Sequence, residues 1–175
     1  MIKLYSFAFL MLILVSCSKP EKPSVESEVI QTELTGGASS IDSLMILFVD
    51  GLNRRDSLLL SEIVISEYEH NELLLPEFHL HYPAATKENQ DVIWTNLSNR
   101  TLKGFLYLMG NMTGKSFKYE TVKFEDPVEN YETYSIHTNS VITLSDSIGI
   151  KRNLKLFGSV VEKNGRFKLL SYKEH

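Results

Sequence analysis

Val160-Val161-Glu162-Lys163-Asn164-Gly165-Arg166-Phe167-Lys168-Leu169 is the stretch that decides the fold. An Asn-Gly pair between two apolar runs is the strongest short-range signal of a β-hairpin, because a type I′ turn needs positive φ at both central residues. We predict that this turn joins two antiparallel strands, Ile148–Val161 and Phe167–Tyr172. The last part of the chain is therefore expected to be antiparallel sheet.

Two further strands are expected before this hairpin. Phe117–Glu125 has the composition of a strand and stops at Asp126-Pro127. Tyr131–Leu144 alternates between apolar and polar residues, which places its apolar side chains on one face of a sheet. These apolar residues are Tyr134, Ile136, Ile142 and Leu144.

The first half of the chain has helical periodicity. Ser39 and Asp42 have capping-box spacing, which starts a helix whose apolar residues recur at helical intervals. Asp56 is the N-cap candidate of a second, largely buried helix. A longer helix is expected from about residue 86 to residue 110. Its predicted inner face consists of Trp94, Leu97, Thr101, Phe105, Leu108 and Met112.

Helices followed by strands predict an α+β domain, which we place at residues 39–175. We expect three N-terminal helices packed on one face of a curved antiparallel sheet of about four strands. Between the second and third helices, the segment from Glu72 to Tyr82 is irregular and is interrupted by Pro76 and Pro83. A short strand is expected there, around residues 78–82.

The N-terminus carries Lys3 and then an uncharged, mostly apolar run, Leu4–Val15. A transmembrane helix needs about 20 apolar residues, whereas the apolar part of a secretory signal needs about 7–15, so this run predicts an export signal. It ends in Leu14-Val15-Ser16-Cys17, which resembles the lipobox of bacterial lipoproteins. The resemblance implies that a signal peptide, residues 1–16, is removed and that Cys17 carries a diacylglycerol, with acyl chains such as palmitate.

The resemblance to lipoproteins also implies a membrane partner and a place in the bacterial cell envelope. Two or three acyl chains on Cys17 would hold the protein stably at a membrane, since each buried CH₂ contributes about 0.8 kcal/mol. Residues 17–38 are rich in Pro, Ser, Gly and charged residues, which predicts a flexible tether. Ser18 stands where an Asp would imply inner-membrane retention, so we expect the outer membrane.

The order of elements resembles that of the nuclear-transport-factor-2-like (SnoaL-like) superfamily. Asn53-Arg54-Arg55-Asp56 resembles the opening of that family's second helix, and the hairpin Val160–Leu169 resembles its closing one. Trp94 lies in the expected third helix. The resemblance covers roughly residues 39–175 and implies a cone-shaped, cystatin-like domain. Members of the superfamily include enzymes, ligand binders and dimerisation modules.

A pocket in such a cone would be lined by side chains of the third helix and the sheet. Trp94, Tyr107 and His137 are the candidate ligand-binding residues, although Trp94 and Tyr107 are equally explained as core residues. The expected third helix carries no carboxylate on its inner face. An isomerase-like pair of acid and base is therefore not predicted, and no catalytic residue is assigned.

Glu77, His79 and His81 are the candidate metal ligands. On an extended segment these three side chains project from the same face, where His70 or His137 could supply a fourth ligand. The alternative, which we favour, is that the apolar residues between them face the core while these three face solvent. No cofactor is therefore expected beyond the covalent lipid.

Composition limits the remaining functions. The net charge of −4 and the pI of about 5.7 argue against broad contact with nucleic acid. The single cysteine excludes an intrachain disulfide and a Cys-rich zinc site, and the sequence has no Gly-rich phosphate loop, nucleophile elbow or His-Glu-x-x-His motif. We therefore expect a non-enzymatic lipoprotein that binds a small apolar ligand or a protein partner. An envelope enzyme, isomerase-like or a hydrolase with a metal on His79 and His81, is the alternative, and a homodimer through the open sheet face is a third possibility.

Overall fold

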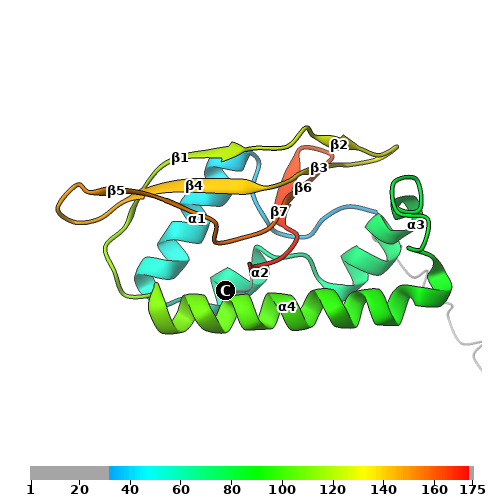
Figure 1. The fold of residues 1–175 in the computed structure, drawn as a ribbon, viewed down its shortest axis with the longest axis horizontal. Coiled ribbons are helices and arrows are strands. Elements are labelled where there is room, and N and C mark those ends of the chain that lie inside the picture. Colours follow the sequence, from blue (N-terminus) through cyan, green and yellow to red (C-terminus); the bar gives the residue numbers. More distant parts are fainter. Residues whose placement is uncertain (1–31, 174–175) are drawn as a thin grey trace, which may run out of the picture. The chain divides into compact units, whose positions relative to one another are not determined.

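The computed structural model describes residues 32–173, in which helices precede strands as the sequence predicts. Cys17, the apolar run before it and most of the expected tether lie outside these residues. The helices are α1 (Ile41–Arg54), α2 (Ser57–Glu62), the π-helix η1 (Glu69–Leu74), α3 (Leu75–Phe78), the 3₁₀-helix η2 (Lys87–Asn89) and α4 (Gln90–Asn111). The strands are β1 (Lys118–Phe124), β2 (Glu129–Asn130), β3 (Ser135–His137), β4 (Ser140–Ser145), β5 (Lys151–Leu154), β6 (Val160–Lys163) and β7 (Arg166–Leu169). Figure 1 shows their arrangement.

The first two helices begin at residues whose side chains satisfy free backbone N–H groups. Ser40, one residue after the predicted Ser39, accepts a hydrogen bond from the backbone N–H of Ser43 and caps α1. Asp56 caps α2 by accepting from the backbone N–H of Leu59, which confirms the prediction for this residue.

The strands form two sheets, with the orders β1-β4-β5 and β2-β3-β6-β7, and neither sheet is closed or curled. The prediction of a single curved sheet of about four strands is therefore wrong, although the α+β class and the antiparallel pairing are confirmed. Two stretches that were predicted to be single strands, Tyr131–Leu144 and Ile148–Val161, each contribute to both sheets. The break in the first of these stretches has a local cause, because Asn139 between β3 and β4 is left-handed, with φ 53°. Pro127, which has no N–H for a sheet ladder, separates the end of β1 from the start of β2.

The terminal hairpin has the turn that the sequence predicts. Asn164 and Gly165 have φ values of 51° and 71°, so both central residues are left-handed as a type I′ turn requires. Lys163 pairs with Arg166 directly across the turn. The predicted turn and the antiparallel pairing are confirmed, whereas the strands that the turn joins, β6 and β7, are shorter than the predicted stretches.

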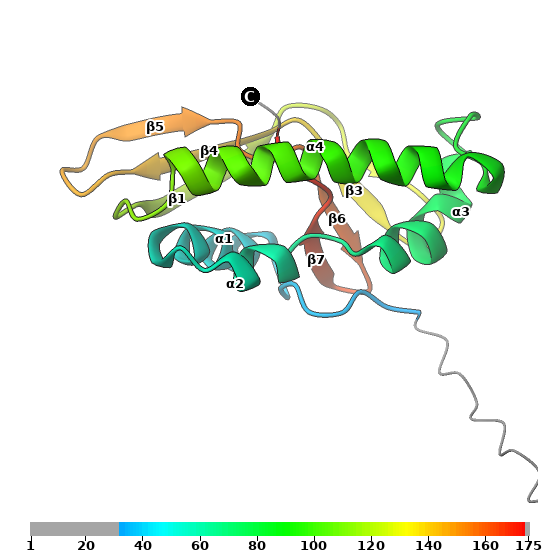
Figure 2. The same cartoon turned by 90° about the horizontal axis from the view of Figure 1, so that it is seen from below.

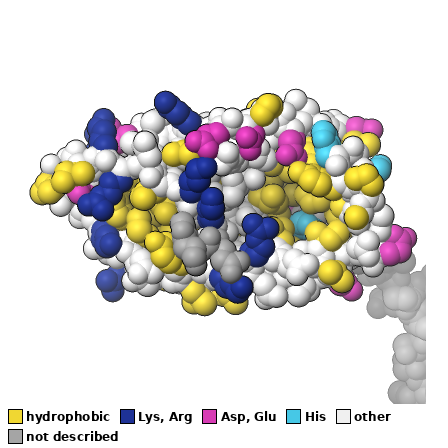
Figure 3. Space-filling model, in the orientation of Figure 1, with side chains coloured by type: hydrophobic (Ala, Val, Ile, Leu, Met, Phe, Trp, Pro, Cys, Tyr) yellow, Lys and Arg dark blue, Asp and Glu magenta, His cyan; other side chains and the backbone are white. Residues whose placement is uncertain are grey.

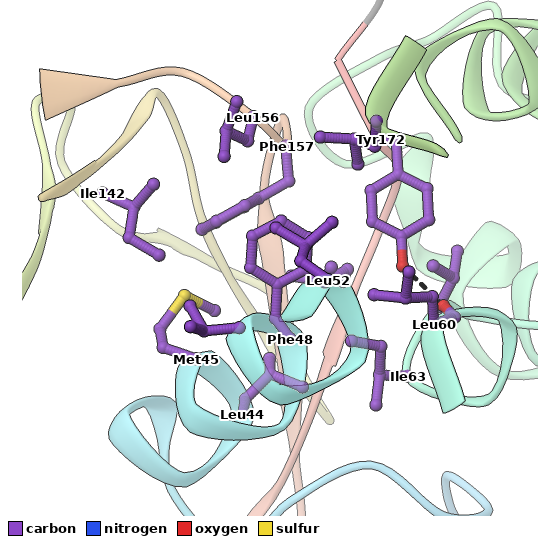
Figure 4. Close-up of a cluster of buried hydrophobic side chains, with 14 of the residues drawn as sticks. Leu44, Met45, Phe48, Leu52, Leu60, Ile63, Ile142, Leu156, Phe157 and Tyr172 are labelled. Carbon is purple, nitrogen blue, oxygen red and sulfur yellow. Dashed lines mark hydrogen bonds between the residues drawn. The ribbon is translucent and has the colours of Figure 1, made fainter. Parts of the chain in front are cut away.

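The main core lies between α1, α2 and the strands, as Figure 4 shows. Phe48 of α1 stands edge-on to Phe157 and stacks with Tyr172, at ring-centroid distances of 5.6 and 6.1 Å. The Tyr172 hydroxyl donates to the carbonyl oxygen of Leu60 in α2. The buried ring of Tyr172 therefore ties the end of the chain to the helices without leaving a polar atom unpaired.

A second buried cluster lies under η1 and α3. Leu74, Phe78, Tyr134 and Val161 belong to it, and the Tyr134 hydroxyl donates to the carbonyl oxygen of Leu74. Leu34 is also buried in this cluster, although the sequence assigns it to the tether. The chain therefore packs against the domain before residue 39.

Helix α4 is long but makes few fully buried contacts. Figure 1 and Figure 2 show it reaching from the end of the domain that holds α3 towards the end that holds β5. Only Gly104 and Leu108 are buried within it, so most of the predicted inner face is half-buried. Within residues 32–173, no helix combines the length and the apolar character that crossing a membrane requires.

Gly104 lies close to the backbone of Tyr172 and Lys173. A Cβ at this position would lie 2.6 Å from the carbonyl oxygen of Lys173 and 2.8 Å from the carbonyl carbon of Tyr172. Gly110 in the same helix has no atom within 4 Å of the corresponding position. The last strand segment and α4 can therefore approach each other only where a side chain is absent.

We predict that Gly104→Ala and Gly110→Ala change stability in opposite directions. Gly104→Ala should destabilise the protein by about 1–3 kcal/mol, because backbone atoms cannot move aside cheaply. Gly110→Ala should stabilise it by about 0.5–1 kcal/mol through helix propensity alone. Urea unfolding followed by circular dichroism measures both. Equal effects of the two substitutions would contradict the proposed close approach.

Candidate functional site

A pocket of about 280 Å³ lies between α4, the end of α2 and the end of the chain. Apolar side chains make up most of its wall, and hydroxyl groups the remainder. The lining residues are Ser61, Val64, Ile65, Trp94, Ser98, Thr101, Leu102, Phe105, Leu170 and Tyr172. Five of these come from α4, at intervals that place them on neighbouring turns of one face.

The pocket exists because α4 is held close to the domain at two places and carries small side chains between them. Near its start, the ring of Trp94 packs against His70, with 5.4 Å between ring centroids. Further along, Gly104 lies against the backbone of Tyr172. Ser98 and Thr101 lie between these contacts and are too short to fill the space beneath the helix.

The polar groups of the pocket wall are largely occupied. Ser98 donates to the carbonyl oxygen of Thr95, and Ser61 donates to the carbonyl oxygen of Leu58, at 3.1 and 2.8 Å. The Tyr172 hydroxyl donates to Leu60. The pocket therefore presents an apolar interior, with serine oxygens that can still accept hydrogen bonds.

His70, which packs behind Trp94, is fully buried in the π-helix η1. Its Nδ1 lies 2.7 Å from the side-chain oxygen of Asn71, and its ring meets Phe78 edge-on. Its Nε2 is buried and has no hydrogen-bond partner among residues 32–173. Burial lowers the pKa of His70, because the charged ring would be poorly solvated there.

Glu69 fixes the position of η1. Its carboxylate accepts from the backbone N–H groups of Ser66 and Thr35, at 2.7 and 2.8 Å, and from Lys168 of β7 at 2.9 Å. Burial by itself would raise the pKa of Glu69, but these hydrogen bonds outweigh it and hold the pKa below its usual value. Ser66 accepts in return from the N–H of Glu69 at 3.2 Å, which is the reciprocal pattern of a capping box.

The three predicted ligand-binding residues lie in different places. Trp94 lines the α4 pocket, whereas Tyr107 lines a separate hollow with Lys115. His137 lies on β3, where its Nε2 is 3.0 Å from Glu162. The prediction of one pocket lined by all three is therefore not supported. Trp94 and Tyr107 are thirteen residues apart on α4, about 20 Å along its axis, and His137 lies on a sheet strand.

The predicted metal ligands are not brought together either. Glu77 accepts from Thr133, His79 lies 2.8 Å from the carbonyl oxygen of Pro76, and His81 lies 3.1 Å from the carbonyl oxygen of Asn130. The residues around them form α3 and a turn, so the prediction of an extended segment is wrong.

The reason is local. Pro76 in the first turn of α3 favours helix, and a helix removes the alternation that would place the three side chains on one face. Among residues 32–173, no three His, Cys, Asp or Glu side chains form a group that could hold a metal ion.

Comparisons with protein-family models, curated proteins and solved structures found no match to this chain. The site is therefore interpreted from its own geometry. Of its wall, the sequence identified Trp94 as a ligand-binding candidate and Thr101 and Phe105 as inner-face residues of the helix. The sequence named His70 only as a possible fourth metal ligand and did not identify Glu69. Ser66 and Glu69 nevertheless have the capping-box spacing of a helix start, at the helical turn that leads into η1.

We predict that His70→Phe reduces the loss of stability on acidification. The folded state keeps His70 neutral, so its contribution is present above the unfolded pKa of about 6.5 and is lost as the pH falls towards the lowered folded pKa. A single such group changes the unfolding free energy by up to about 1.4 kcal/mol per pH unit. Urea unfolding between about pH 7 and pH 5 measures the slope.

His79→Phe is the control for this experiment, because His79 is exposed and its substitution leaves the buried ring of His70 in place. The His79 variant should keep the slope of the original chain. A slope that His70→Phe leaves unchanged would show that the buried imidazole is not what makes stability depend on pH.

Proposed function

We propose that this chain is a membrane-anchored lipoprotein of the bacterial cell envelope whose domain binds a small, mainly apolar ligand in the α4 pocket. The observation that carries the proposal is the pocket itself, an apolar space of about 280 Å³ that the surrounding side chains leave open. The core beside it is filled by aromatic rings, so the space is confined to the region under α4.

The size of the pocket limits the ligand. Ligand sites commonly measure about 300–1,000 Å³, so this one lies just below that range. An apolar cavity of about 150 Å³ is enough for benzene. The α4 pocket therefore suits a ligand of one or two rings or a short acyl chain, with a polar end that donates to serine oxygens at the wall.

The chemistry of the wall favours binding over catalysis. None of the lining residues is Asp, Glu, His, Lys, Arg or Cys. The hydroxyl of Tyr172 is the only titratable group, and it is already donating to a backbone carbonyl. Without an acid or a base to activate the Ser61, Ser98 and Thr101 hydroxyls, the pocket can hold and orient a ligand but has no group suited to move a proton.

The anchor and the fold relationship complete the proposal. Cys17 follows an apolar run of the length expected for an export signal, which supports acylation and outer-membrane location. The order of helices before strands supports a relationship to the nuclear-transport-factor-2-like superfamily, whereas the two separate sheets depart from its single curved one.

Trp94 provides the test of the pocket, because it is the only tryptophan and lines the wall. Titration with naphthalene or octanoate should change its fluorescence to a saturating value. Ser98→Phe should fill the space and weaken binding by about tenfold or more. The ligand would lose apolar burial comparable to that of one side chain, which corresponds to roughly 1.5 kcal/mol. Asn96→Phe, an exposed position outside the wall, should leave binding unchanged. Equal affinities for the two variants would overturn the proposed site.

Cys17 provides the test of the anchor. Mass spectrometry of the native product should show a chain that begins at Cys17 and carries the mass of acyl chains. Cys17→Ser should abolish both the acylation and the cleavage before this residue. A mature product with an unmodified thiol would contradict the lipoprotein assignment while leaving the pocket proposal intact.

A further inference from the structure

The connection between β4 and β5, residues 146–150, carries two exposed aliphatic side chains. We refer to this connection as the β4–β5 tip. Ile148 is 79% exposed and Ile150 is 50% exposed. The Asp146 carboxylate accepts from the backbone N–H groups of both residues, at 3.1 and 2.9 Å, and Gly149 between them has φ 84°. The turn is therefore held in one conformation that directs two large apolar groups into solvent, an arrangement with no benefit to folding.

Four basic side chains lie directly behind this tip. Lys151 and Arg152 are successive residues of β5, so they project from opposite faces of the hairpin. On one face, Lys118 and Lys151 line a hollow of about 650 Å³. On the other face, Lys115 and Arg152 line a hollow of about 490 Å³.

Figures 1 and 3 show the same arrangement in space. The connection between β4 and β5 lies at the left end of Figure 1, and Figure 3 shows hydrophobic side chains at that end with a band of Lys and Arg beside them. The chain as a whole has a net charge of −4, so this concentration of positive charge is not a consequence of composition.

Two carboxylates neutralise this region only in part. Glu120 bridges Lys118 and Lys151, at 3.7 and 3.1 Å, and Asp146 lies 3.8 Å from Arg152. Four cations against two carboxylates leave a net positive charge, and all four basic side chains are exposed. Their ammonium and guanidinium groups can therefore exchange these weak surface pairs for phosphate groups.

We propose that the β4–β5 tip docks on an anionic lipid surface. Ile148 and Ile150 would enter the boundary between headgroups and acyl chains, while the basic residues on both faces of the hairpin contact lipid phosphates. Apolar residues at a tip surrounded by cations are what interfacial binding requires, because burial and electrostatic attraction then act together. Nucleic acid would gain nothing from two exposed isoleucines. This inference does not depend on the α4 pocket.

Amide hydrogen exchange of the full chain in lipid vesicles tests the proposal. Exchange of residues 147–151 should slow by about tenfold when phosphatidylglycerol is added to phosphatidylcholine vesicles, since burial of one isoleucine corresponds to that factor. The double variant Ile148→Asp, Ile150→Asp should remove this protection. Val92→Asp is the matched control, because Val92 is 63% exposed and belongs to the first turn of α4. The start of α4 lies at the opposite end of Figure 1 from β5, so this variant should behave as the original chain does.

The contribution of charge is tested separately. Lys115→Gln combined with Lys151→Gln removes one cation from each face and should weaken the affinity for these vesicles by about fivefold for each charge lost, so that most of the protection disappears. Flotation of the same vesicles reports attachment through the N-terminus, so a failure of the anchor is distinguishable from a failure of the tip. Equal exchange with and without phosphatidylglycerol would overturn the proposal, as would protection by soluble polyphosphate alone.

Discussion

The buried ion pair between Glu69 and Lys168 holds together three parts of the domain that are distant in sequence. Glu69 starts the π-helix η1, Lys168 lies on β7, and both bind the backbone of Thr35, where the chain enters the domain. Because both charges are almost fully buried, losing either partner would leave an unpaired charge at a cost of about 3–5 kcal/mol. The helical half and the strand half of the domain therefore have a fixed relative position at this point.

The two candidate binding surfaces depend on how the other elements attach to the part of the domain that the Glu69–Lys168 pair holds together. The η1 helix carries His70, which supports Trp94 at one end of the pocket, and Gly104 allows the chain end to approach α4 at the other. The β4–β5 tip, in contrast, lies at the end of the strands that do not pair with β7. One surface is an apolar pocket that opens to solvent, and the other is an exposed pair of isoleucines with positive charge around it, so they suit different partners.

The α4 pocket shows which features of a binding site can be predicted from a sequence. Helical periodicity predicted that Thr101 and Phe105 share a face with Trp94, and all three line the pocket. The same pattern could not show that this face encloses a space, because the opposite wall comes from residues far along the chain. For Glu77 to His81, alternation of polar and apolar residues predicted an extended segment, whereas the proline before them favoured a helical turn.

By itself, the sequence determined the features that depend on backbone geometry within a few residues. Asn164-Gly165 fixed the type I′ turn, Asp56 fixed the start of α2, and the order of periodicities fixed the α+β class. Tertiary structure decided the division into two sheets, the burial of Glu69 and the pocket under α4. These features depend on contacts such as that between Glu69 and Lys168, which are 99 residues apart, and no local pattern encodes which distant partner a buried charge will meet.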